Sequence, residues 1–283
     1  MTHLNEKLTG LVSLVKLQNV SVLLLAQLLV AHFIFAPESS FNALLVQQGF
    51  IYMLLATGSA ITAGYIINHF YNLKRDLINR PQQSLLEQKL SMDKKLYLYF
   101  FLNLLTLLFA YFISWRAVLF FAVYEFLIWI YFHKIQPVPF WHELTVTLLT
   151  VYPFFGLMLF FKSVSGFVIW AGILFVLLLL LKEIIKNHLT LRGDVAQNIK
   201  TVLVAKGEGF QLKMFFTLIF LTGIVLSVSF LRNFSEAFTV FVCAFYVMLL
   251  VVSVLYYKKH YVSAYTLVKV IIISGVFSLF LLR

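Results

Sequence analysis

Long apolar runs recur through almost the whole chain and constrain its fold more than any other feature. Each run has about 17–22 residues, enough for a helix to cross a hydrocarbon core of about 30 Å. Nine such runs lie near 20–36, 47–67, 96–113, 117–133, 143–161, 166–186, 213–231, 235–256 and 265–282. Because lipid offers no partner for backbone polar groups, and because the runs do not look like the short alternating strands of a barrel, they are predicted to be helices. We therefore expect an all-α integral membrane protein with nine transmembrane helices in one domain over residues 1–283.

The composition excludes several other classes of protein. The chain is 62% hydrophobic and 12% charged, whereas an ordinary globular protein has about 45–50% apolar and about 25% charged residues. Its mean hydropathy is +0.95. Abundant aromatic and β-branched residues oppose disorder, and the single Cys243 cannot form an internal disulfide. A cytosolic enzyme, a disordered chain and a disulfide-built secreted chain are excluded, and nucleic acid is not an expected partner.

Basic residues are distributed unequally between the two sides of the expected bundle. With the N-terminus inside, only four of the 22 basic residues fall outside, namely Arg116, Lys162, Arg232 and Arg283. An excess of Lys and Arg is typical of cytoplasmic loops. The sequence therefore predicts a cytoplasmic N-terminus and, with nine spans, an external C-terminus. We expect the protein to lie in a lipid bilayer, and the sequence is compatible with a bacterial inner membrane.

Two polar connections on the predicted cytoplasmic side, residues 68–95 and 187–212, are longer than the other turns. Long polar connections in a compact bundle usually carry function. At about 100° per residue, polar side chains near each connection share one helix face. They are Asn68, Asn72, Asp76 and Asn79 in the first stripe, and Glu183, Asn187, Thr190 and Asp194 in the second. Polar stripes at the mouth of an apolar bundle indicate a site for an amphiphile with an anionic head and a long hydrocarbon tail.

These segments resemble the UbiA superfamily of intramembrane prenyltransferases. The matching segments are Gly64-Tyr65-Ile66-Ile67-Asn68, Ile78-Asn79-Arg80-Pro81, Lys182-Glu183-Ile184-Ile185-Lys186, Gly193-Asp194 and Ile199-Lys200-Thr201, with weaker matches at Asn19, Tyr131, Lys134, Pro137 and Gly156. They are most similar to the geranylgeranylglycerol-phosphate geranylgeranyltransferase-like branch, which makes archaeal-type ether lipids. The resemblance implies a nine-helix bundle in which a prenyl diphosphate, bound through Mg²⁺, ionises and an acceptor attacks the allylic carbocation.

The metal-binding motifs of that family are incomplete in this sequence. In the first motif, Asn-Asp-x-x-Asp-x-x-x-Asp, Asn68 and Asp76 match, whereas His69 and Asn72 replace two aspartates. In the second motif, Asp-x-x-x-Asp, only Asp194 matches. These are the positions on which the family's chemistry depends.

Mg²⁺ is the cofactor that the resemblance implies for an active enzyme. It is a hard cation that binds carboxylates and phosphate oxygens, whereas an imidazole suits transition metals better. Asp76, Asp194 and Glu183 are the acidic residues left to hold it, because Thr190 stands where the other aspartate of the second motif belongs.

The resemblance also implies a set of site residues. The catalytic candidates are Asn68, Asn72, Asp76 and Asp194. The substrate-binding candidates are Lys134, Lys182, Lys186, Arg80, Lys200, Asn19 and Tyr131. Segment 68–95 contains six basic and three acidic residues, so Arg and Lys side chains could also bind phosphate oxygens without a metal. Glu125, inside an apolar run, either serves a substrate cavity or is a paired or protonated structural residue.

Three classes of function stay open at this point. The chain is either a prenyltransferase that moves an isoprenyl group from a prenyl diphosphate to a lipid or aromatic acceptor, or a catalytically silent homologue. The silent homologue would bind an isoprenoid or phospholipid and serve a partner protein. A small transporter, the third class, predicts paired discontinuous helices at mid-membrane, and the sequence shows no Gly- or Pro-broken pairs of that kind.

Overall fold

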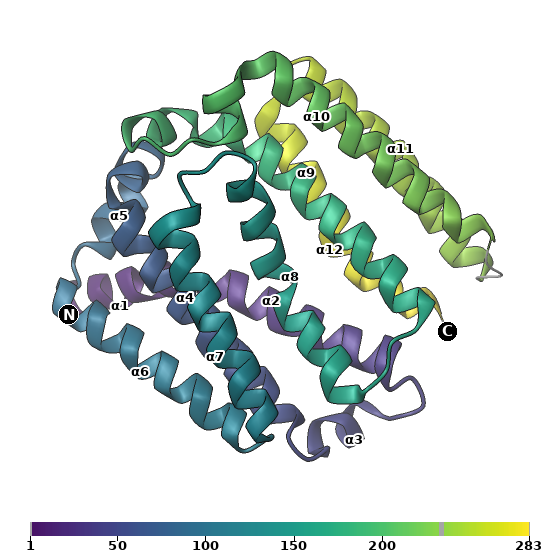
Figure 1. Ribbon diagram of the computed structural model, residues 1–283, viewed down its shortest axis with the longest axis horizontal. Helices are drawn as coiled ribbons and strands as arrows, with labels where there is room; N and C mark the ends of the chain where they lie inside the picture. The colour runs from purple at the N-terminus through teal and green to yellow at the C-terminus, as the bar shows by residue number, and fades with distance from the viewer. Residues whose placement is uncertain (1, 232–234, 283) are drawn as a thin grey trace. The chain divides into compact units, whose positions relative to one another are not determined.

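The computed structural model describes residues 2–231 and 235–282, and this part of the chain contains helices and no strands. In chain order the elements are α1 (Thr2–Val15), α2 (Leu17–Val30), η1 (Ala31–Phe35), α3 (Phe41–Val46), α4 (Phe50–Asn79), α5 (Pro81–Glu87), α6 (Met92–Tyr111), α7 (Trp115–Ile130), η2 (Tyr131–Ile135), α8 (Trp141–Phe161), α9 (Gly166–Ala196), α10 (Val202–Ser227), η3 (Val228–Leu231), α11 (Glu236–Tyr257), α12 (Tyr261–Phe277) and η4 (Ser278–Leu282) (Figure 1). The all-α prediction is confirmed.

The expected count of nine membrane helices is not confirmed. Within the described ranges, eight helical segments are long and apolar enough to cross a membrane. They are Leu17–Phe35, Phe50–Asn79, Trp115–Ile135, Trp141–Phe161, Gly166–Ala196, Val202–Ser227, Glu236–Tyr257 and Tyr261–Leu281. Helix α6 covers most of the third expected run but is not one of them. Charged residues at its start, including Lys94 and Lys95, lower its mean hydropathy.

The polar stretches expected between helices are largely helical themselves. Helix α4 continues through the first stripe to Asn79, and Pro81 begins α5, as expected for a residue that lacks a backbone N–H. Helix α9 likewise continues through the second stripe to Ala196. Asn72 interrupts the regular geometry of α4 with φ −111° and ψ 18°. Most motif side chains therefore project from the ends of long helices rather than from loops.

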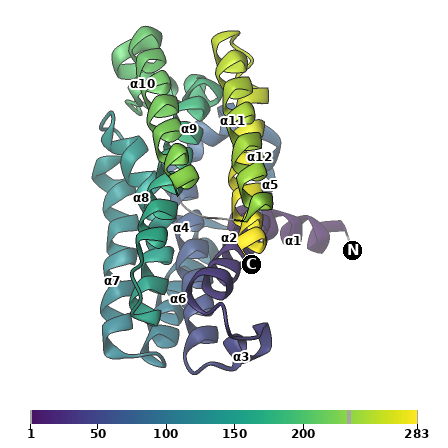
Figure 2. The ribbon, with the colours of Figure 1, turned by 90° about the vertical axis from the view of Figure 1, so that its right-hand side faces the viewer.

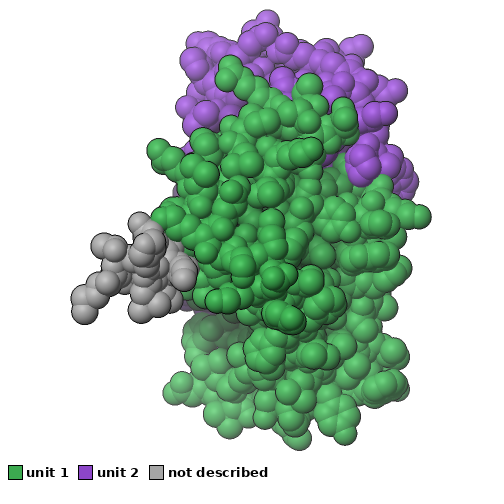
Figure 3. Space-filling view, turned by 90° about the vertical axis from the view of Figure 1, so that its left-hand side faces the viewer, with its two compact units in different colours: residues 1–28, 38–136, 192–198 green, residues 29–37, 137–191, 199–283 purple. Residues whose placement is uncertain are grey.

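The chain divides into two compact units, coloured separately in Figure 3. Unit 1 comprises residues 1–28, 38–136 and 192–198, and unit 2 comprises residues 29–37, 137–191 and 199–283. In unit 1, α4 packs against α6 and α7, and α1 contacts α4 and α5. In unit 2, α11 packs against α10 and α12, and α11 and α12 run side by side in Figure 2.

Small residues bring α4 close to its neighbours in unit 1. Ala56 and Ala60 are fully buried. A Cβ atom added to Gly64 would lie 3.6 Å from the side chain of Ile128 on α7. Such small residues allow close approach of membrane helices, for which dispersion contacts replace the hydrophobic effect.

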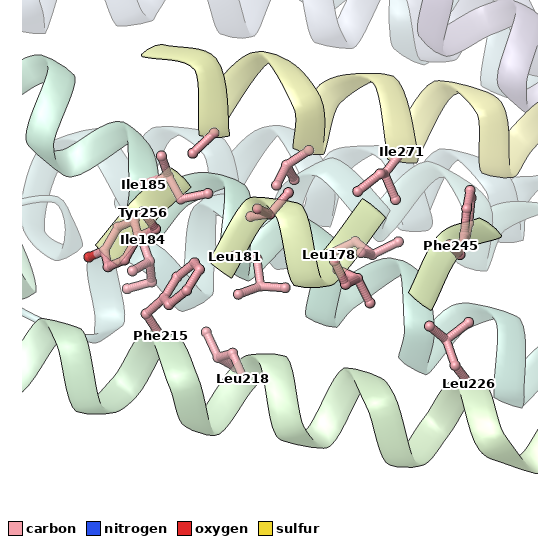
Figure 4. Close-up of a cluster of buried hydrophobic side chains, with 14 of the residues drawn as sticks. Leu178, Leu181, Ile184, Ile185, Phe215, Leu218, Leu226, Phe245, Tyr256 and Ile271 are labelled. Carbon is pink, nitrogen blue, oxygen red and sulfur yellow. The ribbon is translucent and has the colours of Figure 1, made fainter. Parts of the chain in front are cut away.

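An apolar cluster from α9, α10, α11 and α12 forms the core of unit 2 (Figure 4). Leu181, Ile184 and Ile185 of α9 are fully buried in this cluster. The rings of Phe215 and Tyr256 stack with their centroids 3.8 Å apart. This core fixes the part of α9 that carries the beginning of the second polar stripe.

Candidate functional site

The amide side chains of the first stripe form a hydrogen-bonded chain in unit 1. Asn72 donates through Nδ2 to Oδ1 of Asn68 at 2.6 Å. Gln136, which follows η2, donates through Nε2 to Oδ1 of Asn72 at 2.7 Å. Asn72 and Gln136 are both buried. The amide oxygens that a metal ion would use therefore accept hydrogen bonds from the chain itself.

Asp194, the matching residue of the second motif, pairs with an arginine of the first stripe. Nε of Arg75 lies 2.7 Å from Oδ1 of Asp194, and the Asp194 side chain is 0% exposed. The backbone N–H of Arg75 donates to Oε1 of Gln197 at 3.0 Å. Gln197 in turn donates through Nε2 to the carbonyl of Tyr71. Residues 192–198 are thereby attached to the end of α4.

Gly193 allows this close approach. Its backbone N–H donates to Oδ1 of Asn79 at 3.2 Å. A Cβ atom at position 193 would lie 2.4 Å from Nδ2 of Asn79 and 2.8 Å from the carbonyl oxygen of Arg75. Any larger residue would force the two helix ends apart.

Asp76, the matching carboxylate of the first motif, also pairs with a cation. Its Oδ2 atom accepts from the guanidinium of Arg80, one helical turn later. Arg80 donates in addition to Oε1 of Gln83 at 3.3 Å. Asp76 itself is buried, so its negative charge is neutralised within the chain.

His69, in place of a motif aspartate, is the centre of a buried hydrogen-bonded chain. Its Nδ1 atom lies 3.0 Å from Oε2 of Glu87, and its Nε2 atom lies 2.9 Å from Nζ of Lys95. Ser13 donates to the other Glu87 oxygen at 2.8 Å. His69, Glu87 and Lys95 are each at most 2% exposed. The imidazole thus joins α4 to α5 and α6.

The buried environment around His69 shifts the pKa values of its two hydrogen-bond partners, Glu87 and Lys95. Burial alone would raise the pKa of Glu87, but hydrogen bonds from His69 and Ser13, together with the charge of Arg80, hold it below its usual value. Burial lowers the pKa of Lys95, and the nearby charge of Glu87 opposes this.

The beginning of the second stripe lies in unit 2, where Glu183 is placed between two lysines. Its carboxylate oxygens lie 3.1 Å from Nζ of Lys182 and 2.6 Å from Nζ of Lys186. One turn further along α9, Asn187 donates through Nδ2 to Oε1 of Glu143 at 2.8 Å. Thr190 donates to the carbonyl of Lys186 at 3.2 Å. Here too the acidic side chain is matched by cations of the chain.

The other substrate-binding candidates differ in their exposure to solvent. Asn19, Lys134 and Lys200 are exposed, whereas Tyr131 is buried in η2. Within the described part of the chain, no hydrogen bond or ion pair joins Asn19 or Lys134 to the first stripe in unit 1, or Lys200 to Glu183 in unit 2. Their role in binding remains a prediction.

The residues present do not fit a Mg²⁺ centre. Mg²⁺ needs carboxylate or phosphate oxygens arranged around it. Across residues 2–231 and 235–282, no group of three or more His, Cys, Asp or Glu side chains could hold a metal ion. Asp76, Asp194 and Glu183 each pair with an Arg or Lys instead.

Several residues of these clusters were missed from the sequence. Arg75 follows Asn68 by seven residues and so lies on the same helix face, a signal that would have added it to the first stripe. Gln136 and Gln197 come from distant segments and carry no such signal. Glu87 and Lys95 lie in polar surroundings in the sequence, which indicate solvent rather than burial.

Unit 2 also contains an apolar cavity of about 410 Å³. Its walls come mainly from α8, α9, α11 and α12, with side chains such as Val151, Phe154, Leu178 and Phe245, and smaller parts come from α2, η1, α10 and η4. Among the described residues that line the cavity, Ser278 is the only one with a hydroxyl group. A cavity of this character accommodates hydrocarbon.

The fold and its polar helix ends define a polytopic, all-helical integral membrane protein with carboxylate and amide motifs at the ends of α4 and α9. The chain belongs to the UbiA prenyltransferase family, whose model matches residues 24–279. It is 27% identical over 169 residues to the digeranylgeranylglyceryl phosphate synthase of Methanobrevibacter smithii, which covers 56% of this chain and 58% of the relative. It is 31% identical over 146 residues to that of Thermococcus sibiricus, 51% of each chain. The matches thus span little more than half the length of these curated relatives.

Solved structures show the same fold. A structure of digeranylgeranylglyceryl phosphate synthase in membranes has a TM-score of 0.72 at 17% identity and covers 98% of both chains. A UbiA homologue from Archaeoglobus fulgidus, bound to DMAPP and Mg²⁺, has a TM-score of 0.67 at 15% identity and covers 95% of this chain and 98% of that one. The prediction of an all-α membrane fold and the resemblance to UbiA proteins are confirmed, whereas the count of nine spans is not.

Proposed function

We propose that this UbiA-family chain binds an isoprenoid lipid with a phosphate or diphosphate head through its own cationic side chains, and that it does not perform Mg²⁺-dependent prenyl transfer. One observation carries the proposal: the acidic residues left at the motif positions are paired internally. The pairs are Asp76 with Arg80, Asp194 with Arg75, and Glu183 with Lys182 and Lys186. A carboxylate held by a guanidinium or ammonium group has little negative charge left to attract a metal ion.

Cations for the anionic head are available in unit 2. Lys182 and Lys186 share a single carboxylate, that of Glu183, so the cluster keeps one net positive charge. The two lysine side chains are 21% and 31% exposed, whereas Glu183 is 6% exposed. Charge-assisted hydrogen bonds from such groups to phosphate oxygens are short and strong. A head group would therefore meet the lysines before the carboxylate.

The hydrocarbon tail has a matching environment in the same unit. The apolar cavity is lined by α9 up to Leu178. Lys182 follows Leu178 by four residues, about 6 Å along the helix axis. One helix thus carries an apolar wall and, directly after it, a cationic pair, which is the order that an amphiphile requires.

The relatives support the choice of ligand class. Two of them are digeranylgeranylglyceryl phosphate synthases, and UbiA homologues from Archaeoglobus fulgidus are bound to DMAPP or GPP with Mg²⁺. We propose a geranylgeranyl-type diphosphate as the probe of first choice. Prenyl transfer to a lipid or aromatic acceptor is the alternative, and it requires Mg²⁺ as in the mechanism that the resemblance implies.

We also propose that the basic side of the bundle, including the N-terminus, faces the cytoplasm. The asymmetry of the basic residues supports this orientation. We propose a bacterial inner membrane as its location, with which the single cysteine and the all-helical bundle are compatible. Reporter fusions at the two sides of the bundle would test the orientation directly.

The test of the binding proposal is titration of the full chain in lipid nanodiscs with geranylgeranyl diphosphate, in EDTA and in excess Mg²⁺. We expect equal affinity under both conditions. The triple variant Lys182→Gln/Glu183→Gln/Lys186→Gln removes both cations and the carboxylate that they neutralise, so no unpaired charge confounds folding. We expect it to bind about tenfold more weakly or worse, the loss of one or two charged hydrogen bonds.

Lys162→Gln is the matched control, because Lys162 is an exposed lysine that caps the C-terminal end of α8 and lies 20 residues before Lys182 in the sequence. It should leave the affinity unchanged. Binding that occurs only in Mg²⁺, or that the triple variant does not weaken, contradicts the proposal.

A further inference from the structure

Glu143, at the start of α8, carries one satisfied and one unsatisfied carboxylate oxygen in the interior of unit 2. The residue is 0% exposed. Its Oε1 atom accepts from Nδ2 of Asn187 at 2.8 Å and from the backbone N–H of Val202 at 2.7 Å. Its Oε2 atom is buried and has no hydrogen-bond partner among the described residues. Leaving such an acceptor unpaired is costly, so a partner for Oε2 is expected.

Thr147, one turn later on the same helix, resembles Glu143 in having a buried side-chain oxygen without a hydrogen-bond partner in residues 2–231 and 235–282. It is 1% exposed, and its Oγ1 atom also has no hydrogen-bond partner within the described part of the chain. Thr150, on the same helix, instead donates to the carbonyl of Val146 at 2.8 Å. Two buried oxygen atoms without partners, at positions i and i+4, lie on the same face of α8.

The same helix face reaches the wall of the apolar cavity one turn beyond Thr147, although Glu143 and Thr147 do not line the cavity themselves. Val151, one further turn along α8, is buried and lines the cavity together with Phe154 and Met158. Glu143, Thr147 and Val151 lie within about 80° of one another around the helix, and Thr147 and Glu143 precede Val151 by about 6 Å and about 12 Å along the axis. The cavity wall and the two oxygen atoms are therefore parts of one continuous helix surface.

We propose that Glu143 and Thr147 form a buried subsite for the hydroxyl group of a lipid alcohol whose hydrocarbon tail occupies the apolar cavity. The hydroxyl donates to Oε2 of Glu143 and accepts from Oγ1 of Thr147. An ionised phosphate has no proton to donate and is repelled by the carboxylate, and a charged ammonium costs more to bury than a neutral hydroxyl. The proposal rests on the proposed function, because it requires that the chain binds isoprenoid-type lipids.

Glu143→Gln is the sharpest test. Its amide oxygen can keep the hydrogen bonds from Asn187 and Val202, while its amide nitrogen replaces Oε2 and turns an acceptor into a donor. Thr147→Val is the second variant, of nearly the same shape and without the hydroxyl. Thr150→Val is the matched control, because the Thr150 hydroxyl already bonds within its own helix.

The experiment measures binding of geranylgeraniol, its methyl ether, geranylgeranylamine and geranylgeranyl diphosphate to the full chain in nanodiscs. We expect the wild-type chain to bind the alcohol about tenfold more tightly than the ether, which cannot donate a hydrogen bond. Glu143→Gln should abolish this preference, Thr147→Val should reduce it, and Thr150→Val should keep it.

The outcomes separate this proposal from the proposed function. Equal binding of alcohol and ether by the wild-type chain, a preference that survives Glu143→Gln, or tighter binding of the amine than of the alcohol would overturn the hydroxyl subsite even if the diphosphate binds. Failure to bind any of the four probes would overturn the proposed function and this subsite together. Diphosphate binding without Mg²⁺, combined with the alcohol preference, supports both.

Discussion

Removal of the Arg75 side chain should destabilise the protein strongly, and simultaneous neutralisation of Asp194 should restore most of the loss. The Nε to Oδ1 distance is 2.7 Å, and the two side chains are 10% and 0% exposed. Removing one partner of a buried ion pair costs about 3–5 kcal/mol, because the remaining charge stays buried. Arg75→Met should lose stability in this range. The double variant Arg75→Met/Asp194→Asn leaves no buried charge and should lie within about 1 kcal/mol of wild type.

The assay is thermal unfolding of the purified protein in one detergent, followed by tryptophan fluorescence, for the two single variants and the double variant. Lys259→Gln is the control, because Lys259 is 68% exposed and its ion-pair partner Glu208 is 53% exposed. Its loss should cost about 1 kcal/mol or less. If the double variant is as unstable as the sum of the single variants, Arg75 and Asp194 are not coupled, and internal neutralisation of the motif carboxylate is refuted.

Three further predictions concern the same helix ends. Gly193→Ala should cost about 1–3 kcal/mol in thermal unfolding, because its Cβ atom overlaps Asn79; an unchanged unfolding temperature would contradict the close approach. His69→Asp restores the family residue but faces Glu87 with a second carboxylate, so it should lower the unfolding temperature in Mg²⁺ as well as in EDTA; rescue by Mg²⁺ would reveal a metal site. The pKa of Glu87 is lowered on folding, so its contribution to stability is complete above the usual carboxyl pKa of about 4.3 and is lost as the pH falls below it. Glu87→Gln should therefore flatten the acid side of the stability profile, and a profile identical to wild type would exclude this role.

The sequence predicts the membrane helices well because their signal is local. A run of apolar residues long enough to span lipid is visible without any knowledge of its neighbours. The exception is α6, where Lys94 and Lys95 adjoin the run, so that the helix forms but does not qualify as a span by its mean hydropathy. Lys95 is nevertheless buried beside His69, and such a partner cannot be inferred from the adjacent sequence.

The part of the candidate site that lies within one helix was predictable, because its signal is also local. Helical periodicity groups Asn68, Asn72 and Asp76 correctly on one end of α4. It does not reveal that Gln136, 64 residues later, donates to Asn72, or that Arg75 pairs with Asp194. These contacts depend on tertiary packing, and they decide whether a carboxylate binds a metal ion or a cation of the chain.

The most direct test of the central proposal is release of diphosphate from radiolabelled geranylgeranyl diphosphate by the purified protein in lipid vesicles, with Mg²⁺ and with EDTA, in the presence of a mixture of lipid and aromatic acceptors. The internal pairing of Asp76, Asp194 and Glu183 predicts bound substrate and no release in either condition. Release that requires Mg²⁺ and disappears in Asp76→Ala and Asp194→Ala would contradict the account and show that the family's chemistry persists in this chain.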